Sequence, residues 1–237
     1  MNRYLISFDD TDELNMPGTG HLLDSFLQML PAQCSFISRH QLFVHADVPY
    51  TSHNSAMCAQ IDGQLSVEEL IDQAASYLEQ HSAPGADPGL CVADWETMTQ
   101  RELLVLWGYR AKREVLAKED AYALAQQCSV HLSEHGGTGQ GIVGALAAVG
   151  LRLAGQDGRV KGKRQLEQNC LTVRELLRNT GFDRVCAYGQ GELPLDAMVC
   201  LNGQPVKAVY QNFCATILTA PEGPLYRLLS KDQLKCF

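Results

Sequence analysis

No part of the 237-residue sequence is a long, uninterrupted hydrophobic run. The most apolar stretch, residues 142–154, is rich in glycine and alanine and contains Arg152. It is also shorter than the roughly 20 residues that cross a bilayer. The first apolar run stops at the acidic residues 9–12, so it does not resemble a signal peptide. These absences argue against a membrane-spanning or exported protein and predict a cytoplasmic one.

Basic residues are also scarce. The chain has 19 Lys and Arg against 27 Asp and Glu, which gives a formal charge of −8. Because general nucleic-acid binding depends on cationic contacts with phosphates, this balance argues against it. The one local basic run, residues 159–164, is more typical of a solvated loop.

The nine cysteines include no Cys-x-x-Cys pair and no Cys/His cluster with zinc-ligand spacing. Their pattern therefore excludes the common zinc-binding motifs. An odd number of scattered thiols fits a reducing compartment, and we expect most of them to be small buried apolar residues.

What the chain does contain is typical of a globular α/β (α+β) protein with a mixed sheet. Strand patterns at 4–8, 34–45, 56–61 and 89–94 alternate with helix patterns after 20, from 66 and from 99 to 128. A glycine-rich segment, 135–141, then leads into a helix at 142–149, and the remainder is richer in strands. We expect two domains, 1–130 and 131–237, with the glycine-rich segment at their junction.

Three carboxylates lie within four positions at the end of the first strand. Asp9, Asp10 and Asp12 would repel one another, and each is costly to desolvate. A cation removes both problems, and Mg²⁺ prefers a few carboxylates together with water and phosphate oxygens. The alternative is a solvated strand end with an Asp-rich turn, which is equally compatible with the composition.

A second candidate is Thr19, which lies between Gly18 and Gly20 where a helix is predicted to begin. Backbone N–H groups at a glycine-flanked helix start favour phosphate, and the hydroxyl could contact or accept a phosphoryl group. The competing role is a helix N-cap.

The glycine-rich segment holds four glycines in six positions before a helix. It is neither a Walker loop nor a dinucleotide fingerprint. It could contact phosphate through its backbone, or it could be a flexible loop before a helix of small residues that packs closely. Asn54 could likewise hold a ribose or a phosphate, or form an Asx turn, and His53 could be a base or simply solvated.

Four segments resemble, in order and with similar gaps, the archaeal tRNA-Ile agmatidine synthetase family. FDDTD followed by GTGHL (8–22) is similar to that family's IDDTDS and CTTYL. VPYTSHNSA (48–56) is similar to IPYKTRGNGA, and DPGLCV (87–92) to NPGAVFV. GQGIVGALAAVG (139–150) is similar to GRGLIGALAAVG.

The resemblance implies a kinase-like, ATP-binding domain at 1–130 and a ferredoxin-like domain at 131–237. In that family ATP phosphorylates a cytidine carbonyl oxygen, agmatine displaces the phosphate, and a motif threonine is itself phosphorylated. Carried over, it makes Asp9, Asp10 and Asp12 the metal ligands, and Asp9, Asp10 and Thr19 the catalytic residues. The resemblance also matches Asn54 to a motif asparagine. Together with the glycine-flanked helix start and the glycine-rich segment, this predicts nucleotide contacts at Gly18, Gly20, Asn54, Gly137, Gly139 and Gly141.

The departures from the family limit this prediction. Gly18 and Gly20 replace a cysteine and a threonine, Ser52-His53 replaces Arg-Gly, and Gln140 replaces an arginine. The family's OB-fold and zinc ribbon, which hold tRNA, have no counterpart here. Together with the negative charge, these differences argue against stable tRNA binding.

We therefore predict Mg²⁺/ATP-dependent phosphoryl transfer or ligation on a small acceptor, with Lys161, Lys163 or Arg164 as candidate phosphate-binding cations. Two alternatives stay open: a nucleotide-binding regulatory module without turnover, and a tRNA-modification accessory protein that lacks its RNA-binding domains. A homodimer is also compatible with the sequence.

Overall fold

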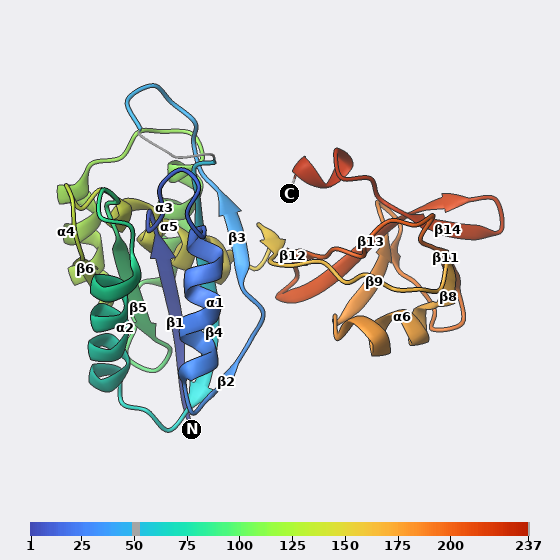
Figure 1. Cartoon of the computed structure of the whole chain (residues 1–237), viewed down its shortest axis with the longest axis horizontal. Helices are drawn as coiled ribbons and strands as arrows, with labels where there is room; N and C mark the ends of the chain where they lie inside the picture. The colour runs from blue at the N-terminus through green and yellow to red at the C-terminus, as the bar shows by residue number, and fades with distance from the viewer. Residues whose placement is uncertain (49–52, 237) are drawn as a thin grey trace. The chain divides into compact units, whose positions relative to one another are not determined.

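A computed structural model of the protein describes residues 1–48 and 53–236. The chain divides into two compact units, Met1–Ala154 (unit 1) and Gly155–Phe237 (unit 2), whose elements are labelled in Figure 1. Each unit mixes helices with a sheet, as the predicted α/β fold class requires.

Unit 1 is built on an antiparallel sheet with the strand order β6-β5-β1-β4-β3, in which the short β2 also pairs with β4. Its strands are β1 (Asn2–Asp9), β2 (Gln33–Cys34), β3 (Ser38–Gln41), β4 (Ser55–Gly63), β5 (Gly89–Asp94) and β6 (His131–Glu134). Strand β1 is central, with β4 and β5 on its two sides. If the two-residue β2 is set aside, the elements from β1 to β5 follow a β-α-β-β-α-β order, the ferredoxin-like arrangement.

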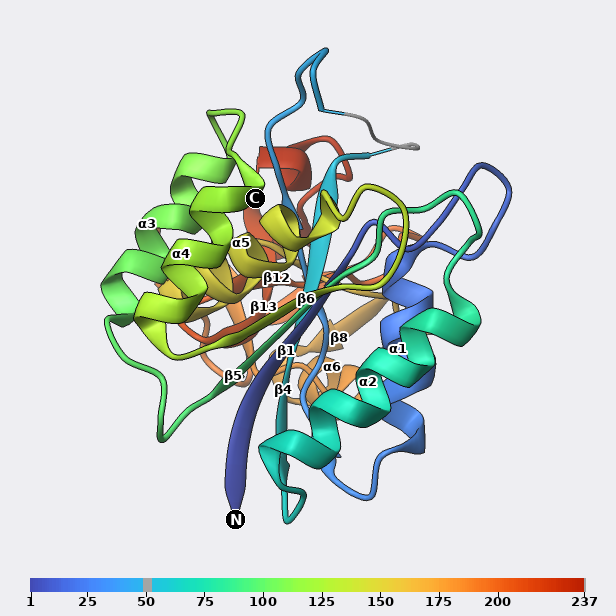
Figure 2. The same cartoon turned by 90° about the vertical axis from the view of Figure 1, so that its left-hand side faces the viewer.

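Helices cover both faces of this sheet. Helices α1 (Thr19–Met29) and α2 (Val67–His81) lie on one face, and α3 (Arg101–Ala111), α4 (Lys118–Cys128) and α5 (Gly141–Ala154) lie on the other, as Figure 2 shows. Alternate residues of β1 serve the two layers: Tyr4, Ile6 and Phe8 pack with α1 and α2, and Leu5 packs with α5. Because both faces of β1 are buried, residues 4–8 are apolar except for the buried Ser7.

The helix α5 packs closely because its residues are small. A Cβ atom added at Gly150 would lie 1.9 Å from the Leu104 carbonyl oxygen, and one at Gly108 would lie 2.8 Å from Leu151 Cγ. The backbones of α3 and α5 therefore approach too closely for a larger side chain at either glycine. The sequence predicted either a phosphate contact at this segment or a helix of small residues that packs closely. These contacts show the close packing.

The division between the units differs from the predicted boundary near residue 130. Strand β6 pairs with β5, and α5 packs against α3, β5 and β1, so both elements complete unit 1. The boundary therefore follows α5. The sequence alone does not show that β6 pairs with a strand some forty residues before it.

Unit 2 has a mixed sheet. It contains β7 (Arg159–Val160), β8 (Cys170–Thr172), α6 (Val173–Thr180), β9 (Arg184–Ala187), β10 (Gly191–Glu192), β11 (Met198–Cys200), β12 (Val209–Gln211), β13 (Cys214–Glu222), β14 (Leu225–Leu228) and the 3-10 helix η1 (Gln233–Cys236). The long β13 pairs in parallel with β9 and antiparallel with β12 and β14. Helix α6 begins with a reciprocal capping box between Thr172 and Glu175.

One pair of cysteines departs from the expectation of scattered free thiols. Cys170 and Cys200 face each other across β8 and β11, with Cα atoms 4.1 Å apart, and form a disulfide. Of the remaining cysteines, Cys58, Cys91 and Cys128 are buried, as predicted. None of the described helices is both long enough and apolar enough to cross a membrane.

Candidate functional site

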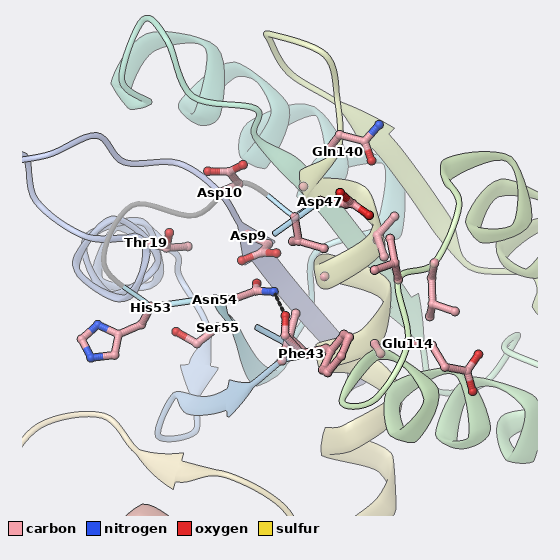
Figure 3. A pocket seen from close by; sticks show the side chains of 18 of the residues that line it. Asp9, Asp10, Thr19, Phe43, Asp47, His53, Asn54, Ser55, Glu114 and Gln140 are labelled. Atoms are coloured by element: carbon pink, nitrogen blue, oxygen red, sulfur yellow. Dashed lines mark hydrogen bonds between the residues drawn. The ribbon is translucent and has the colours of Figure 1, made fainter. Parts of the chain in front are cut away.

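A cavity of about 900 Å³, open solvent included, lies in unit 1 at the end of β1 (Figure 3). Five parts of unit 1 meet there: the end of β1 with the residues after it, the N-terminus of α1, the chain around the β3–β4 connection, the C-terminus of α3 and the N-terminus of α5. The lining residues are Asp9, Asp10, Asp12, Thr19, Leu42, Phe43, Asp47, Val48, His53, Asn54, Ser55, Ala111, Glu114, Val115, Leu116, Gln140, Gly141, Val143 and Gly144.

The carboxylates at the end of β1 are held where their charge is unfavourable. Asp9 is 8% exposed, and its burial, followed by the neighbouring Asp10, raises its pKa well above the ordinary value. Burial, then Asp87 and Asp12, raises the pKa of Asp10 to about 6. Asp10 also has a left-handed backbone, with φ 51°, which Asp adopts more readily than most residues. A cation beside these two groups would relieve both desolvation and repulsion.

The predicted ligand set does not form a closed metal cage. Among the described residues, no group of three His, Cys, Asp or Glu side chains is arranged to hold a metal ion. Asp12 instead accepts a hydrogen bond from Thr19, 3.0 Å between Oδ1 and Oγ1. Asp9 and Asp10 remain as carboxylates of the kind that Mg²⁺ takes together with phosphate and water oxygens.

Thr19 is fixed by a small hydrogen-bond network. Its hydroxyl donates to Asp12 and accepts from the Thr11 hydroxyl, 3.1 Å away. The N-cap of α1 is Gly18, which has no side chain to cap with, so Thr19 does not take the alternative N-cap role. A hydroxyl that donates to a carboxylate has a proton acceptor beside it, which is the arrangement that general-base activation requires.

Asn54 also lies at the cavity. Its side-chain amide donates to the Phe43 carbonyl oxygen at 2.6 Å, the bond drawn in Figure 3. This bond joins the beginning and the end of the segment that connects β3 with β4. The structure therefore gives Asn54 a bracing role in one wall of the cavity. Pro49 to Ser52, part of the same predicted motif, lie outside the described residues.

The predicted glycines separate into three groups. Gly141 lines the cavity, together with Gln140 and Gly144. Gly137 and Gly139 do not: both have positive φ, and a Cβ at either would meet Asp87 or Glu134. Their loop is tied down by Thr138, whose hydroxyl donates to Asp87 Oδ2 at 2.7 Å. These two glycines are thus required by the fold of the loop. Gly18 and Gly20 line a neighbouring pocket, described below.

The apolar wall of the cavity was not predicted from the sequence. It comes from residues before β4 and around the end of α3: Leu42, Phe43, Ala111, Val115, Leu116 and, from α5, Val143. These residues belong to no motif, and only the packing of α3 against α5 brings the segments together. Asp47 and Glu114 add two further carboxylates. Among the described lining residues none is Lys or Arg, so a polyanion would need a cation to enter.

The missed cation is Arg39, on β3. A second pocket, about 530 Å³ with open solvent included, shares Asp12, Thr19, His53 and Ser55 with the first and is also lined by Gly18, Gly20, His21, Arg39 and Met57. The Arg39 guanidinium donates from Nε to Ser55 Oγ at 2.9 Å. The predicted candidates Lys161, Lys163 and Arg164 belong to unit 2.

Comparison with known proteins finds likeness in structure. No protein-family model matches the chain, and no curated protein matches its sequence. A solved tRNA fluorescent labeling enzyme superposes with a TM-score of 0.54 and 24% identity, over 62% of this chain and 36% of that one. The complex of TiaS with an isoleucine tRNA and ATP gives 0.55 and 23%, over 63% and 36%. TiaS with the same tRNA, AMPCPP and agmatine gives 0.56 and 19%, over 74% and 43%.

TiaS is the agmatidine synthetase of an isoleucine tRNA, so the solved structures confirm at the level of fold the resemblance seen in the sequence. The chain has a TiaS-like α/β fold, consistent with kinase-like and ferredoxin-like parts. It spans little more than a third of the length of the first of these proteins.

Proposed function

We propose that the unit 1 cavity binds ATP with Mg²⁺, and that the protein uses it for phosphoryl transfer or an ATP-driven ligation. The observation that carries this proposal is the placing of Asp9 and Asp10, two carboxylates with raised pKa values, beside the Thr19 hydroxyl in one cavity. Proteins of similar fold were solved in complex with ATP and AMPCPP, which supports a nucleotide as ligand.

The lining of the cavity offers both kinds of contact that a nucleotide needs. Leu42, Phe43 and Val143 offer apolar contact for a base, and Asp9 and Asp10 offer ligands for a metal-bound triphosphate. Asp9 and Asp10 would hold Mg²⁺, which supplies neutralisation of phosphate charge. Phosphoryl transfer depends mainly on positioning and charge, so these groups are sufficient for the metal side of the reaction.

Thr19, Asp12 and Arg39 would act on the opposite side of the transferring phosphate. The Asp12 carboxylate holds the Thr19 hydroxyl and can take its proton, so that Thr19 could receive the phosphoryl group. Arg39 lines the adjoining pocket with both residues and is the cation that we assign to the phosphate. That polar pocket is where we place the acceptor.

A tRNA acceptor is the second candidate. Its support is that structures of similar fold were solved with an isoleucine tRNA. The charge of the chain is also uneven: unit 2 has 11 Lys and Arg against 8 Asp and Glu, a formal charge of +3, and unit 1 carries −11. The overall negative charge therefore does not describe unit 2 and does not by itself exclude RNA there.

Nucleotide binding is tested first, by thermal unfolding with AMPCPP in the presence and absence of Mg²⁺. We expect Mg²⁺-dependent stabilisation of the wild type, its loss in Asp10→Asn, and no change in Glu119→Gln, which removes an exposed carboxylate from α4. A wild type that no Mg²⁺-nucleotide stabilises would overturn the proposal.

Turnover is tested separately, by phosphate or pyrophosphate release with a panel of small amines and alcohols and with transcribed tRNA. Binding without release for any acceptor would favour the regulatory module. Release that depends on tRNA alone would favour the second candidate.

A further inference from the structure

A third cavity, separate from the two pockets of unit 1, is lined only by residues of unit 2. It has a volume of about 600 Å³, open solvent included. Its floor is apolar: Leu218 comes from β13, Leu228 from β14, and Leu229 and Leu234 from the chain at and before η1, each at most 7% exposed. Pro205 and Gln204 complete the lining, together with two lysines. A floor of buried leucine side chains is suited to an aliphatic group.

The two lysines, Lys207 and Lys231, bring positive charge to this apolar cavity. Neither forms a hydrogen bond or an ion pair with a residue that the structure describes. Burial lowers the pKa of Lys207, and the nearby Lys231, Arg159 and Lys163 lower it further. Three other cations thus lie close enough to repel Lys207, in the unit whose formal charge is +3. An anion between them would relieve that repulsion.

The walls of the cavity are held by hydrogen bonds of the protein. The Leu229 N–H donates to the Leu218 carbonyl oxygen at 3.0 Å, which fixes two of the leucines. At the start of η1, Ser230 N–H donates to Gln233 Oε1 at 2.9 Å, and Gln233 N–H donates to Ser230 Oγ at 3.3 Å. A reciprocal pair of this kind fixes the turn that carries Lys231 and Leu234, so the cavity is formed before a ligand enters.

We propose that this cavity binds a small amphipathic anion, with its aliphatic body against the leucines and its carboxylate or phosphate head between Lys207 and Lys231. Single-stranded nucleic acid is a poorer fit, because bases bind by stacking on aromatic side chains and the described lining residues include none. The four leucines would also contribute nothing to a phosphate backbone. The combination of four leucines and two lysines therefore favours a ligand that is apolar at one end and anionic at the other.

The test uses the full-length protein and four probes: decanoate, octyl phosphate, decylamine and inorganic phosphate. Binding is measured by calorimetry and by chemical shifts of leucine methyl groups. We expect both amphipathic anions to bind and to shift the methyl groups, and the other two probes to do neither. A preference between decanoate and octyl phosphate identifies the head group.

Substitutions then locate the site. We expect Lys207→Gln and Lys231→Gln each to weaken binding by about tenfold, the effect of losing one charge-assisted contact. Arg174→Gln is the matched control, because it removes an exposed charge of the same unit at the start of α6. It should leave affinity within twofold.

Three results would overturn the inference. The first is the absence of binding of both amphipathic anions at millimolar concentration. The second is equal affinity in the wild type and the Lys207→Gln/Lys231→Gln double variant, with folding confirmed by circular dichroism. The third is binding of oligouridylate that requires both lysines and is unaffected by decanoate, which would identify the cations as a nucleic-acid surface.

Discussion

At the scale of single residues, the site depends on carboxylates that the fold holds close together and partly out of water. Asp9 and Asp10 follow directly from a strand that is buried on both faces, so the chain cannot move them into solvent without disturbing β1. Asp12 differs, because its partner is the Thr19 hydroxyl. Three acids that look equivalent in the sequence therefore have two different environments.

The raised pKa of Asp10, about 6 against 3.8 for a free Asp, predicts how stability depends on pH. A group that binds its proton more tightly when folded stabilises the fold below its unfolded pKa, and this stabilisation is lost as pH rises through the folded pKa. In EDTA, the free energy of unfolding should therefore decline between about pH 4 and pH 6, by about 1–2 kcal/mol for this group after solvent screening.

Urea denaturation at pH 4, 5, 6 and 7 measures this effect. In Asp10→Asn, the free energy of unfolding should not show the part of this decline that Asp10 causes. In the wild type, adding Mg²⁺ should raise the free energy of unfolding more at pH 7 than at pH 4. A wild type and an Asp10→Asn variant with parallel pH profiles would contradict the assigned pKa. Glu119→Gln serves as the control, because it removes an exposed carboxyl outside the site.

The Thr19 hydroxyl gives a second prediction. Thr19→Val keeps the shape of the side chain but removes the donor to Asp12 and the acceptor for Thr11, whereas Thr19→Ser keeps both. If the hydroxyl takes part in the reaction, Val should lower turnover by about 100-fold or more and Ser by less than about tenfold, with AMPCPP affinity changed by less than threefold in each. Equal turnover in Thr19→Val and the wild type would remove Thr19 from the reaction.

At the scale of elements, the site depends on how closely α5 approaches the end of β1. A Cβ atom at Gly144 would lie 1.8 Å from Asp9 Oδ2 and 3.0 Å from Leu42 Cδ1. The absent side chain is what leaves room for the buried carboxylate. A glycine in the middle of a helix lowers the stability of the helix. At Gly144 this loss accompanies the space that Asp9 needs.

Gly144→Ala should therefore displace Asp9 and weaken Mg²⁺-AMPCPP binding by at least about tenfold, although alanine is the better helix former. Gly18→Ala is the matched comparison, because a Cβ there has Asp12 Oδ2 as its nearest neighbour at 3.8 Å and φ is −68°. It should change stability by no more than about 1 kcal/mol and leave nucleotide binding intact. Calorimetry measures the Mg²⁺-AMPCPP affinity of both variants. Unchanged affinity in Gly144→Ala would contradict the proposed role of Asp9.

The elements themselves were largely predictable. Strand β5 occupies the predicted residues 89–94, the capping box at Ser66 does begin α2, and the predicted helix at 99–128 is broken into α3 and α4. These features depend on local pattern. The apolar wall, Arg39 and the Cys170–Cys200 pair were not found, because each depends on which distant segments pack or pair. The sequence motifs named Thr19 and Asp12 as candidate site residues, but not the hydrogen bond between them.

At the scale of the whole molecule, the two units have different charges and different means of stabilisation. Unit 1 has two layers of helices on its sheet, whereas unit 2 is smaller and has a disulfide that closes a 30-residue loop. Small cores gain most from such a constraint. Their chemistry also differs, with an acidic cavity in one and a cationic cavity in the other.

The disulfide therefore predicts an effect confined to unit 2. The double variant Cys170→Ser/Cys200→Ser should lower the stability of unit 2 by about 2–4 kcal/mol, seen as faster amide hydrogen exchange in β8, β11 and β14. Trp95 and Trp107, the only tryptophans, both lie in unit 1, so their fluorescence gives the control and should report unchanged unfolding of that unit. Unchanged exchange in unit 2 would show that the bond does not stabilise it.

The central position of β1 has a consequence for synthesis of the chain. This strand leaves the ribosome before its partners, which lie at 55–63 and 89–94, and the helix that covers its second face ends at residue 154. Contacts between segments so distant in sequence form slowly. The nascent chain must therefore carry an apolar strand, with its acidic end, through most of the translation of unit 1. The charges of residues 9–12 would keep that exposed strand soluble while it waits for its neighbours.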